Sequence, residues 1–249
     1  MSDEMNLVDW DVYAKCYDAL LELTPYQDMF RTIVTIVSAH EHGTVLDAAC
    51  GTGNLAHYLE AAGVSVDTLV GLDASRTMAH RALDKYAPFC GTVQIGDLCE
   101  PLPFESDTFD CIVSVNTLYT LSDPDRTLAS FARVLRPGGS LIVVNPKQGY
   151  ENGLILREHC NSEKPEEYWM HVHRSSEHEV RMIREALGVT DVSDQFITVA
   201  DCNRRIAHTV AYHFLDERSL RGLIERAGLT ITYLSYVYAG QAIIVTATK

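Results

Sequence analysis

The sequence predicts a doubly wound α/β fold, in which a mostly parallel sheet carries helices on both faces. Short apolar runs typical of buried strands alternate with segments of helical periodicity. Four of these runs end in polar residues, as expected where parallel strands end at a ligand site. A short Ala239-Gly240 link then joins the last two runs as a hairpin, so the final strand should run antiparallel to its neighbours.

The elements follow in order along the chain. We expect strands over 44–49, 66–72, 92–96, 109–115 and 140–146, and helices over 53–62, 75–86 and 125–135. A further helix over 216–228 precedes two closing strands at 230–238 and 241–248, which makes seven strands in total.

The alternation stops after Asn145-Pro146. Residues 147–212 are richer in His, Glu and Arg and contain a helical stretch from about 165 to 187. We interpret this segment as an inserted helical cap that binds the substrate. The core is then formed by 1–146 together with 213–249.

Charge and cysteine content narrow the function. Among the 249 residues, 34 acidic side chains stand against 20 basic ones, for a net charge of −14. This charge repels nucleic acid and anionic membranes, so we expect a small-molecule partner, no nucleic acid and no stable membrane association. The seven cysteines include no Cys-x-x-Cys pair, which argues against a disulfide framework or a zinc site.

The N-terminal 25 residues carry acidic side chains and no unbroken apolar stretch. No segment approaches the roughly 20 apolar residues of a membrane span. The sequence therefore predicts a cytoplasmic protein. It gives no information on the oligomeric state.

The most informative stretch is the apolar strand at Val45 and Leu46 that runs into a turn with Gly51 and Gly53. Glycines let the backbone turn sharply and approach a ligand, and the helix that follows directs its N-terminus at that ligand. The turn also matches the Gly-x-Gly-x-x-Gly/Ala dinucleotide motif, and Asp73 follows Gly51 by 22 positions, near the spacing of a ribose-binding acid. The turn alone is therefore also compatible with a nicotinamide-dependent oxidoreductase.

Three further features carry a family resemblance. Asp47 stands four positions before Gly51, Gly96-Asp97-Leu98 is followed by Pro101-Leu102-Pro103-Phe104, and Leu135-Arg136-Pro137-Gly138-Gly139 precedes a strand. In this order the chain resembles the class I S-adenosylmethionine-dependent methyltransferases of the small-molecule type (methyltransferase-11/25-like). The likeness covers 44–146 and, in architecture, 213–249. It implies a Rossmann-like sheet, S-adenosyl-L-methionine as cofactor, and methyl transfer to a small acceptor.

The resemblance also implies roles for the strand-end residues. Asp47 would receive the ammonium of the methionine moiety, Asp73 would bind both ribose hydroxyls, and Asn116 would lie near the transferred methyl group. The full expected set of cofactor contacts is Tyr13, Tyr17, Asp47, Ala49, Gly51, Gly53, Asp73, Ala74, Met78, Asp97, Leu98 and Asn116.

Some of these residues also have a purely structural interpretation. Strand-end carboxylates often cap the next helix, although Ser75 competes with Asp73 for that role, and Met78 has the spacing of a core residue. Trp10, Tyr13 and Tyr17 stand at i, i+3 and i+7, one face of a helix. This segment resembles the aromatic segment that covers the cofactor in relatives, and packing of a helix on the core is the alternative.

The implied reaction is an in-line displacement in which placement of the reactants supplies most of the rate enhancement. A catalytic base is therefore optional, and the candidates are His159, His171, His173 and Tyr119. His171 and His173 point about 200° apart on a helix and cannot share a metal ion, so we expect no metal. A cofactor-binding module without catalytic activity remains an alternative. A quinone or phospholipid acceptor is compatible with the sequence, although no basic amphipathic face favours membrane docking.

Overall fold

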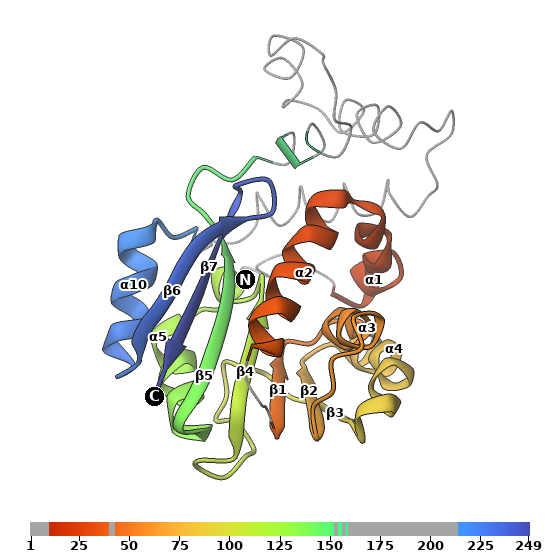
Figure 1. Cartoon of the computed structure of the whole chain (residues 1–249), viewed down its shortest axis with the longest axis horizontal. Coiled ribbons are helices and arrows are strands. Elements are labelled where there is room, and N and C mark those ends of the chain that lie inside the picture. Colours follow the sequence, from red (N-terminus) through yellow and green to blue (C-terminus); the bar gives the residue numbers. More distant parts are fainter. Residues whose placement is uncertain (1–9, 40–42, 152–153, 156–157, 159–213) are drawn as a thin grey trace, which may run out of the picture.

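The computed structural model describes residues 10–39, 43–151, 154, 155, 158 and 214–249. Within these residues the core is one seven-stranded sheet of order β3-β2-β1-β4-β5-β7-β6 (Figure 1). Its strands are β1 (Thr44–Ala48), β2 (Thr68–Asp73), β3 (Thr92–Ile95), β4 (Phe109–Val115), β5 (Leu135–Pro146), β6 (Thr230–Val237) and β7 (Ala242–Thr248).

The pairing confirms the predicted topology. Strands β1 to β5 pair in parallel, and β7 pairs antiparallel with both β5 and β6. The β6–β7 hairpin turns through Tyr238, Ala239 and Gly240, all with positive φ. The chain order reverses between β1 and β4, and parallel sheets bind ligands beyond the carboxyl ends of their strands at such a reversal.

Strand β5 begins earlier than predicted. The sequence places its start at residue 140, and the structure extends it back to Leu135, which pairs with Phe109 across an irregularity in the β4 register. Gly138 donates to the carbonyl of Lys249, and Lys249 donates to the carbonyl of Gly139. These hydrogen bonds to the end of the neighbouring strand turn an expected loop into the start of β5.

Helices cover both faces of the sheet, as predicted for a doubly wound fold (Figure 1). One face packs against α2 (Thr24–Ser38), α3 (Asn54–Ala61) and α4 (Arg76–Tyr86). The other packs against α5 (Pro124–Val134) and α10 (Glu217–Arg226). Short 3-10 helices are η1 (Tyr17–Glu22), η2 (Ala87–Phe89) and η3 (Leu118–Thr120), and α1 covers Trp10–Ala14.

Helix α2 was missed by the sequence analysis. Its buried residues Tyr26, Met29, Phe30, Ile33 and Val37 recur at helical spacing, and Pro25 stands in its first turn. The signal was therefore present in the sequence. The predicted elements include none between the N-terminal aromatic residues and the first strand.

The prediction that Trp10, Tyr13 and Tyr17 share one continuous helix is wrong. Helix α1 ends at Ala14, the chain turns where Lys15 and Cys16 donate to the carbonyls three residues back, and η1 starts at Tyr17. The three rings still form one group, because Tyr13 stacks on Trp10 at 6.0 Å and meets Tyr17 edge-on at 5.2 Å between centroids.

Most of the predicted inserted cap, with the predicted helix at 165–187, lies outside the described residues. Its two ends leave and rejoin the core side by side, because Lys147 forms a parallel bridge with Leu215. Among the described residues, no helix is long and apolar enough to cross a membrane.

Gly222 within α10 and Gly228 just after it should respond in opposite ways to substitution by alanine. Gly222 lies inside the helix, where a Cβ would meet only the flexible end of Arg226, at 3.2 Å. Gly228 follows the helix in the left-handed conformation, with φ +80°. The next residue, Leu229, donates to the carbonyl of Ile224 and closes the end of the helix. Gly222→Ala should raise the free energy of unfolding by about 0.5–1 kcal/mol.

Gly228→Ala is the matched control and should lower the free energy of unfolding by about 1 kcal/mol, because alanine is strained in the left-handed region. Urea denaturation of both variants measures the two shifts. Changes of the same sign would contradict this account of α10.

Candidate functional site

The glycine turn between β1 and α3 combines three left-handed residues. Ala49, Gly51 and Gly53 have φ of 62°, 55° and 84°. At Gly51 an added Cβ would meet only a ring carbon of Tyr17, at 3.5 Å. Ala49 holds this conformation despite its Cβ, which costs about 1 kcal/mol. Such local strain is typical of functional sites.

Asp73 at the end of β2 is fixed by two main-chain donors. Its Oδ2 accepts a hydrogen bond from the Gly51 N–H at 2.8 Å, and its Oδ1 accepts one from the Ser75 N–H at 2.9 Å. Ser75 caps α4, because its hydroxyl accepts from the Met78 N–H at 3.1 Å. Asp73 is therefore not the cap of this helix, and each of its oxygens keeps capacity for a further donor. Burial raises the pKa of Asp73.

Asp47 lies on β1 with only 3% of its surface exposed. The Tyr86 hydroxyl, at the end of α4, donates to Oδ2 of Asp47 at 2.6 Å. Burial, with a contribution from the negative charge of Asp73, raises the pKa of Asp47 to about 7. Tyr86 is not among the predicted site residues, because no spacing rule links residues 39 positions apart.

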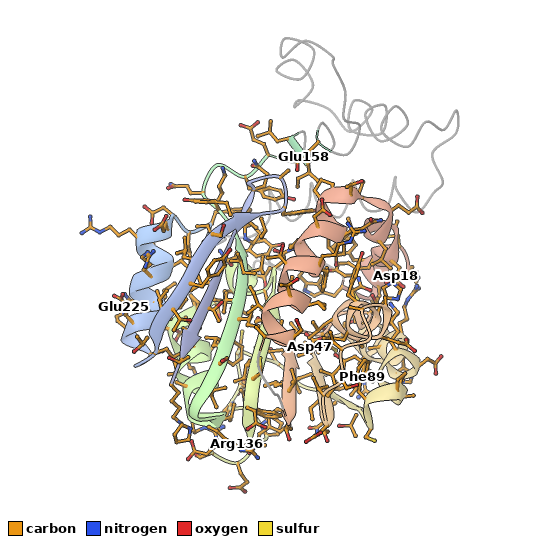
Figure 2. The ribbon with its side chains drawn as sticks, in the orientation of Figure 1. Asp18, Asp47, Phe89, Arg136, Glu158 and Glu225 are labelled. Atoms are coloured by element: carbon orange, nitrogen blue, oxygen red, sulfur yellow. The ribbon has the colours of Figure 1, made fainter. Side chains whose placement is uncertain are left out.

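The two carboxylates lack a cationic partner within the described part of the chain. Arg81 and Lys85 on α4, the helix that also carries Tyr86, bind Asp18 instead, at 3.1 and 3.3 Å. Figure 2 shows Asp18 and Asp47 on the side of the molecule that carries α1, α3 and α4. Buried charge is stable only when paired or hydrogen-bonded, so this arrangement fits a ligand that brings positive charge and hydroxyl donors.

The register places the other predicted residues along the same edge of the sheet. Asp47 pairs with Gly71 on β2 and Val113 on β4, so Asp73 and Asn116 each lie a few residues beyond it at the carboxyl ends. Asp97 follows β3, is exposed, and accepts from the Cys99 N–H at 2.8 Å.

Asn116, directly after β4, has φ 52°, and its N–H donates to the Val144 carbonyl. Its Oδ1 is buried and, among the described residues, has no hydrogen-bond partner. An unpaired buried oxygen is costly, which marks this position as one that a ligand donor can satisfy.

The remaining predicted contacts, Ala74, Leu98 and Met78, lie in the same region and make contacts within the protein. Ala74 links Asp73 to the Ser75 cap, and the Leu98 carbonyl accepts from the Thr127 hydroxyl at 3.1 Å. Met78 is buried in the core cluster that also contains Tyr13. Its structural interpretation as a core residue is therefore consistent with the packing, and its contact with the cofactor stays a prediction.

Residues 10–22, which we call the N-terminal clasp, are held to both sides of the glycine turn. Asp11 accepts from the Ser75 hydroxyl and from the Thr77 N–H at the start of α4. Asp18 accepts from the Thr52 hydroxyl within the turn. These contacts lower the pKa of Asp11, chiefly through Ser75, and hold that of Asp18 below its ordinary value despite burial. The clasp thereby brings the Tyr17 ring against Gly51.

A buried polar network supports the clasp from behind. Asn54 donates to the Tyr26 hydroxyl at 3.2 Å and accepts from Lys85 at 3.0 Å, and the Tyr26 hydroxyl donates to that of Tyr17 at 3.5 Å. The network ties α2, α3, α4 and the clasp together. None of its members was predicted as a site residue except Tyr17.

An aromatic cluster stands where the inserted segment leaves and rejoins the core. Tyr119 packs against Phe214 at 5.4 Å between centroids, Phe214 stacks on Tyr150 at 6.1 Å, and Tyr150 packs against Tyr238 at 6.5 Å. Tyr119 is thus the one predicted base candidate that the structure describes. His159, His171 and His173 lie outside the described residues.

Comparison with known proteins gives a consistent result. Residues 46–143 match the family model of a methyltransferase domain. A ubiquinone/menaquinone biosynthesis C-methyltransferase of Geobacter sulfurreducens is 34% identical over 118 residues, which cover 46% of each chain. One from Teredinibacter turnerae is 30% identical over 188 residues, which cover 74% of this chain and 66% of the relative. The match spans about half the length of the first of these relatives.

Solved structures share the fold at low sequence identity. A methyltransferase-fold chain from Haloferax volcanii, solved in complex with the Trm112 methyltransferase activator, aligns with TM-score 0.65 and 16% identity over 97% of this chain and 98% of its own. A SAM-dependent methyltransferase from Aquifex aeolicus aligns with TM-score 0.56 and 17% identity, over 95% and 97% of the two chains. At this identity the likeness shows the fold alone.

The clasp yields a prediction for Asp18. Asp18→Asn keeps an acceptor for Thr52 but removes the charge that holds Arg81 and Lys85. Because Asp18 is half-buried, the free energy of unfolding should fall by about 1–2 kcal/mol. Trypsin should also cleave after the exposed Lys15 more rapidly than in the unmodified protein.

Asp28→Asn removes the exposed Arg31–Asp28 ion pair of α2 and serves as the control. It should change stability by less than about 0.5 kcal/mol and leave cleavage after Lys15 unaltered. Equal behaviour of the two variants in urea denaturation and proteolysis would refute the clasp.

Proposed function

We propose that this chain, which belongs to the class I S-adenosylmethionine-dependent methyltransferase family, transfers a methyl group from S-adenosylmethionine to a small organic acceptor. The observation that carries this proposal is the pair of buried carboxylates, Asp47 and Asp73, beside a glycine turn and without a cation from the described residues. A ligand with an ammonium group, a sulfonium and a ribose supplies the charge and the hydroxyl donors that these carboxylates lack.

The residues fit this cofactor at separate points. We assign the ammonium to Asp47, whose Oδ1 accepts no hydrogen bond from the described residues. We assign the ribose hydroxyls to the two oxygens of Asp73, each of which already accepts one main-chain donor. Asn116 Oδ1 is assigned to the region of the transferred methyl, and Asp97 to the adenine amino group.

The work of these residues in the reaction is placement. S-adenosylmethionine supplies an electrophilic methyl group on a positively charged sulfur. Asp47 and Asp73 hold the two ends of the cofactor, and holding reactants in line can contribute on the order of 7–11 kcal/mol. Carboxylates assigned to the ammonium and the ribose do not stabilise the sulfonium itself, so they do not raise the barrier to losing its charge. A general base is needed only for an acceptor that must lose a proton.

The dinucleotide alternative fits these side chains poorly. In NAD-binding proteins the glycine turn faces a pyrophosphate, which carries negative charge. Here the turn lies against Asp73, which binds the Gly51 N–H, and close to Asp47. Two carboxylates without a nearby cation repel a pyrophosphate, whereas they attract a cationic cofactor.

The acceptor is proposed to enter beside the aromatic cluster of Tyr119, Tyr150, Phe214 and Tyr238. The inserted segment 147–212 begins and ends there, and Tyr119 lies three residues after Asn116. The curated relatives are named for ubiquinone and menaquinone biosynthesis. A reduced quinone ring is therefore the first acceptor to test.

Cofactor choice is tested by isothermal titration of the purified protein. S-adenosylhomocysteine should bind, and NADH should give no heat above dilution. Incubation with methyl-labelled S-adenosylmethionine and a panel of quinols, phenols and amines should then label at least one acceptor. Binding of NADH alone would overturn the proposal, and cofactor binding without any labelled product would favour a binding module.

The ribose assignment is tested with Asp73→Asn. The substitution keeps the shape and one acceptor oxygen but removes the charge, so affinity for S-adenosylhomocysteine should fall by about 1.5–3 kcal/mol, roughly ten- to more than a hundredfold. Asp84→Asn, at an exposed position of α4, removes one negative charge elsewhere and should leave the affinity unchanged. Equal affinities of the two variants would exclude Asp73 from the binding site.

A further inference from the structure

The ring of Tyr86 packs closely against two glycines. A Cβ on Gly53 would stand 3.2 Å from its Cε2 and equally close to Ala82 of the same helix, and a Cβ on Gly71 would stand 3.0 Å from its Cε1 and Cζ and from the Cys50 sulfur. Glycine in the middle of a strand is unfavourable and marks a close approach of another group. The ring of Tyr86 and the Cys50 sulfur both approach β2 at Gly71, so the ring lies against β2 and against the glycine turn at Gly53.

The Tyr86 hydroxyl is the one donor that the described residues offer to the Asp47 carboxylate, at 2.6 Å. The titratable groups that face Asp47 are Asp73 on β2, Cys50 in the glycine turn, Tyr86 on α4 and, farther away, Tyr17 on η1. None of these four brings positive charge. Burial and Asp73 oppose ionisation of Asp47, and the hydrogen bond from Tyr86 favours it.

The two contacts of Tyr86 act on the same part of the site. Its ring packs against the glycine turn at Gly53 and against β2 at Gly71, and its hydroxyl donates to Oδ2 of Asp47 while Oδ1 accepts nothing from the described residues. A carboxylate held at one oxygen keeps the other available for a ligand cation.

We propose that Tyr86 is a positioning residue for the cofactor. Its hydroxyl holds Asp47 as a carboxylate, with one oxygen left to bind the cofactor's ammonium, and its ring holds the glycine turn against β2. This inference rests on the proposed function, because it takes the ammonium as the partner of Asp47. It assigns to Tyr86 no contact with the cofactor.

The proposal predicts a pH dependence of binding. Only ionised Asp47 pairs with an ammonium, and with a pKa of about 7 about one molecule in ten is ionised at pH 6. Affinity for S-adenosylhomocysteine should therefore be roughly tenfold weaker at pH 6 than at pH 8, because the competent fraction scales the apparent affinity. Loss of the Tyr86 hydroxyl removes a contact that favours the ionised form, so the midpoint of this profile should move to higher pH.

The experiment is titration of S-adenosylhomocysteine into the unmodified protein and Tyr86→Phe between pH 6 and pH 9. The phenylalanine ring keeps the packing against both glycines. Tyr86→Phe should bind roughly five- to fiftyfold more weakly at pH 7, and the ratio of the two affinities should shrink to within about twofold at pH 9. The ligand's own ammonium titrates equally in both proteins, so the ratio is the quantity compared. A ratio that stays constant across this range would overturn the proposal.

Two controls separate the positioning role from a structural one. Adenosine lacks the ammonium, so its affinity should vary with neither pH nor Tyr86→Phe. Asp47→Asn should flatten the pH profile for S-adenosylhomocysteine, and adding Tyr86→Phe to it should cause no further loss. A further loss in the double variant, or an equal loss for adenosine, would show that Tyr86 acts through packing alone.

These outcomes are distinct from failure of the proposed function. If the unmodified protein binds no S-adenosylhomocysteine at any pH, the cofactor assignment itself is wrong. If it binds with the expected pH dependence and Tyr86→Phe binds identically, only the role of Tyr86 is overturned.

Discussion

Two carboxylates, Asp47 and Asp73, are buried at the carboxyl edge of a parallel sheet without a positive charge from the described residues. The surrounding structure supplies these carboxylates with hydrogen-bond donors. Main-chain N–H groups of Gly51 and Ser75 hold Asp73, and a single tyrosine hydroxyl holds Asp47. Such neutral donors reduce the cost of burying negative charge and leave it unneutralised. This arrangement is the basis of the proposal that a cationic ligand binds at this edge.

The same constraint explains why two basic side chains of α4 pair with a different carboxylate. Arg81 and Lys85 project from α4, the helix that also carries Tyr86, and both are bound by Asp18 of the N-terminal clasp. If either cation paired with Asp47 or Asp73, it would compete with a cationic ligand for the same carboxylate. The clasp therefore has two effects: it closes one side of the glycine turn with Tyr17, and it pairs Arg81 and Lys85 with Asp18.

Glycine has a different purpose at each position of this site. Gly51 is left-handed, and an added Cβ would meet only the Tyr17 ring of the clasp. At Gly53 an added Cβ would meet Ala82 and Tyr86 of α4, and at Gly71 it would meet Cys50 and Tyr86. Gly51 and Gly53 belong to one motif, although Gly53 is required by the close packing of α4 and Gly51 is not.

The sequence by itself determined the order and type of most elements and the edge at which the site lies. Apolar runs alternate with helical periods, and the polar residues that end the runs mark one edge of the sheet, because both signals arise from neighbours along the chain. This local information placed Asp47, Asp73, Asp97 and Asn116 correctly. The helical spacing of α2 is also a local signal, whereas the early start of β5 depends on hydrogen bonds to Lys249, more than a hundred residues away.

Only the tertiary structure decided which distant residues contact Asp47 and the segments around the glycine turn and Asp73. Tyr86 reaches Asp47 across 39 residues, Asp18 reaches Thr52 across 34, and Asp11 reaches Ser75 across 64. The N-terminal aromatic residues kept their grouping but not their single helix, because the clasp bends to place both of its carboxylates. Periodicity and motif spacing report what lies along one element. Contacts between elements depend on how helices are set against the sheet, and no local pattern in the chain encodes that arrangement.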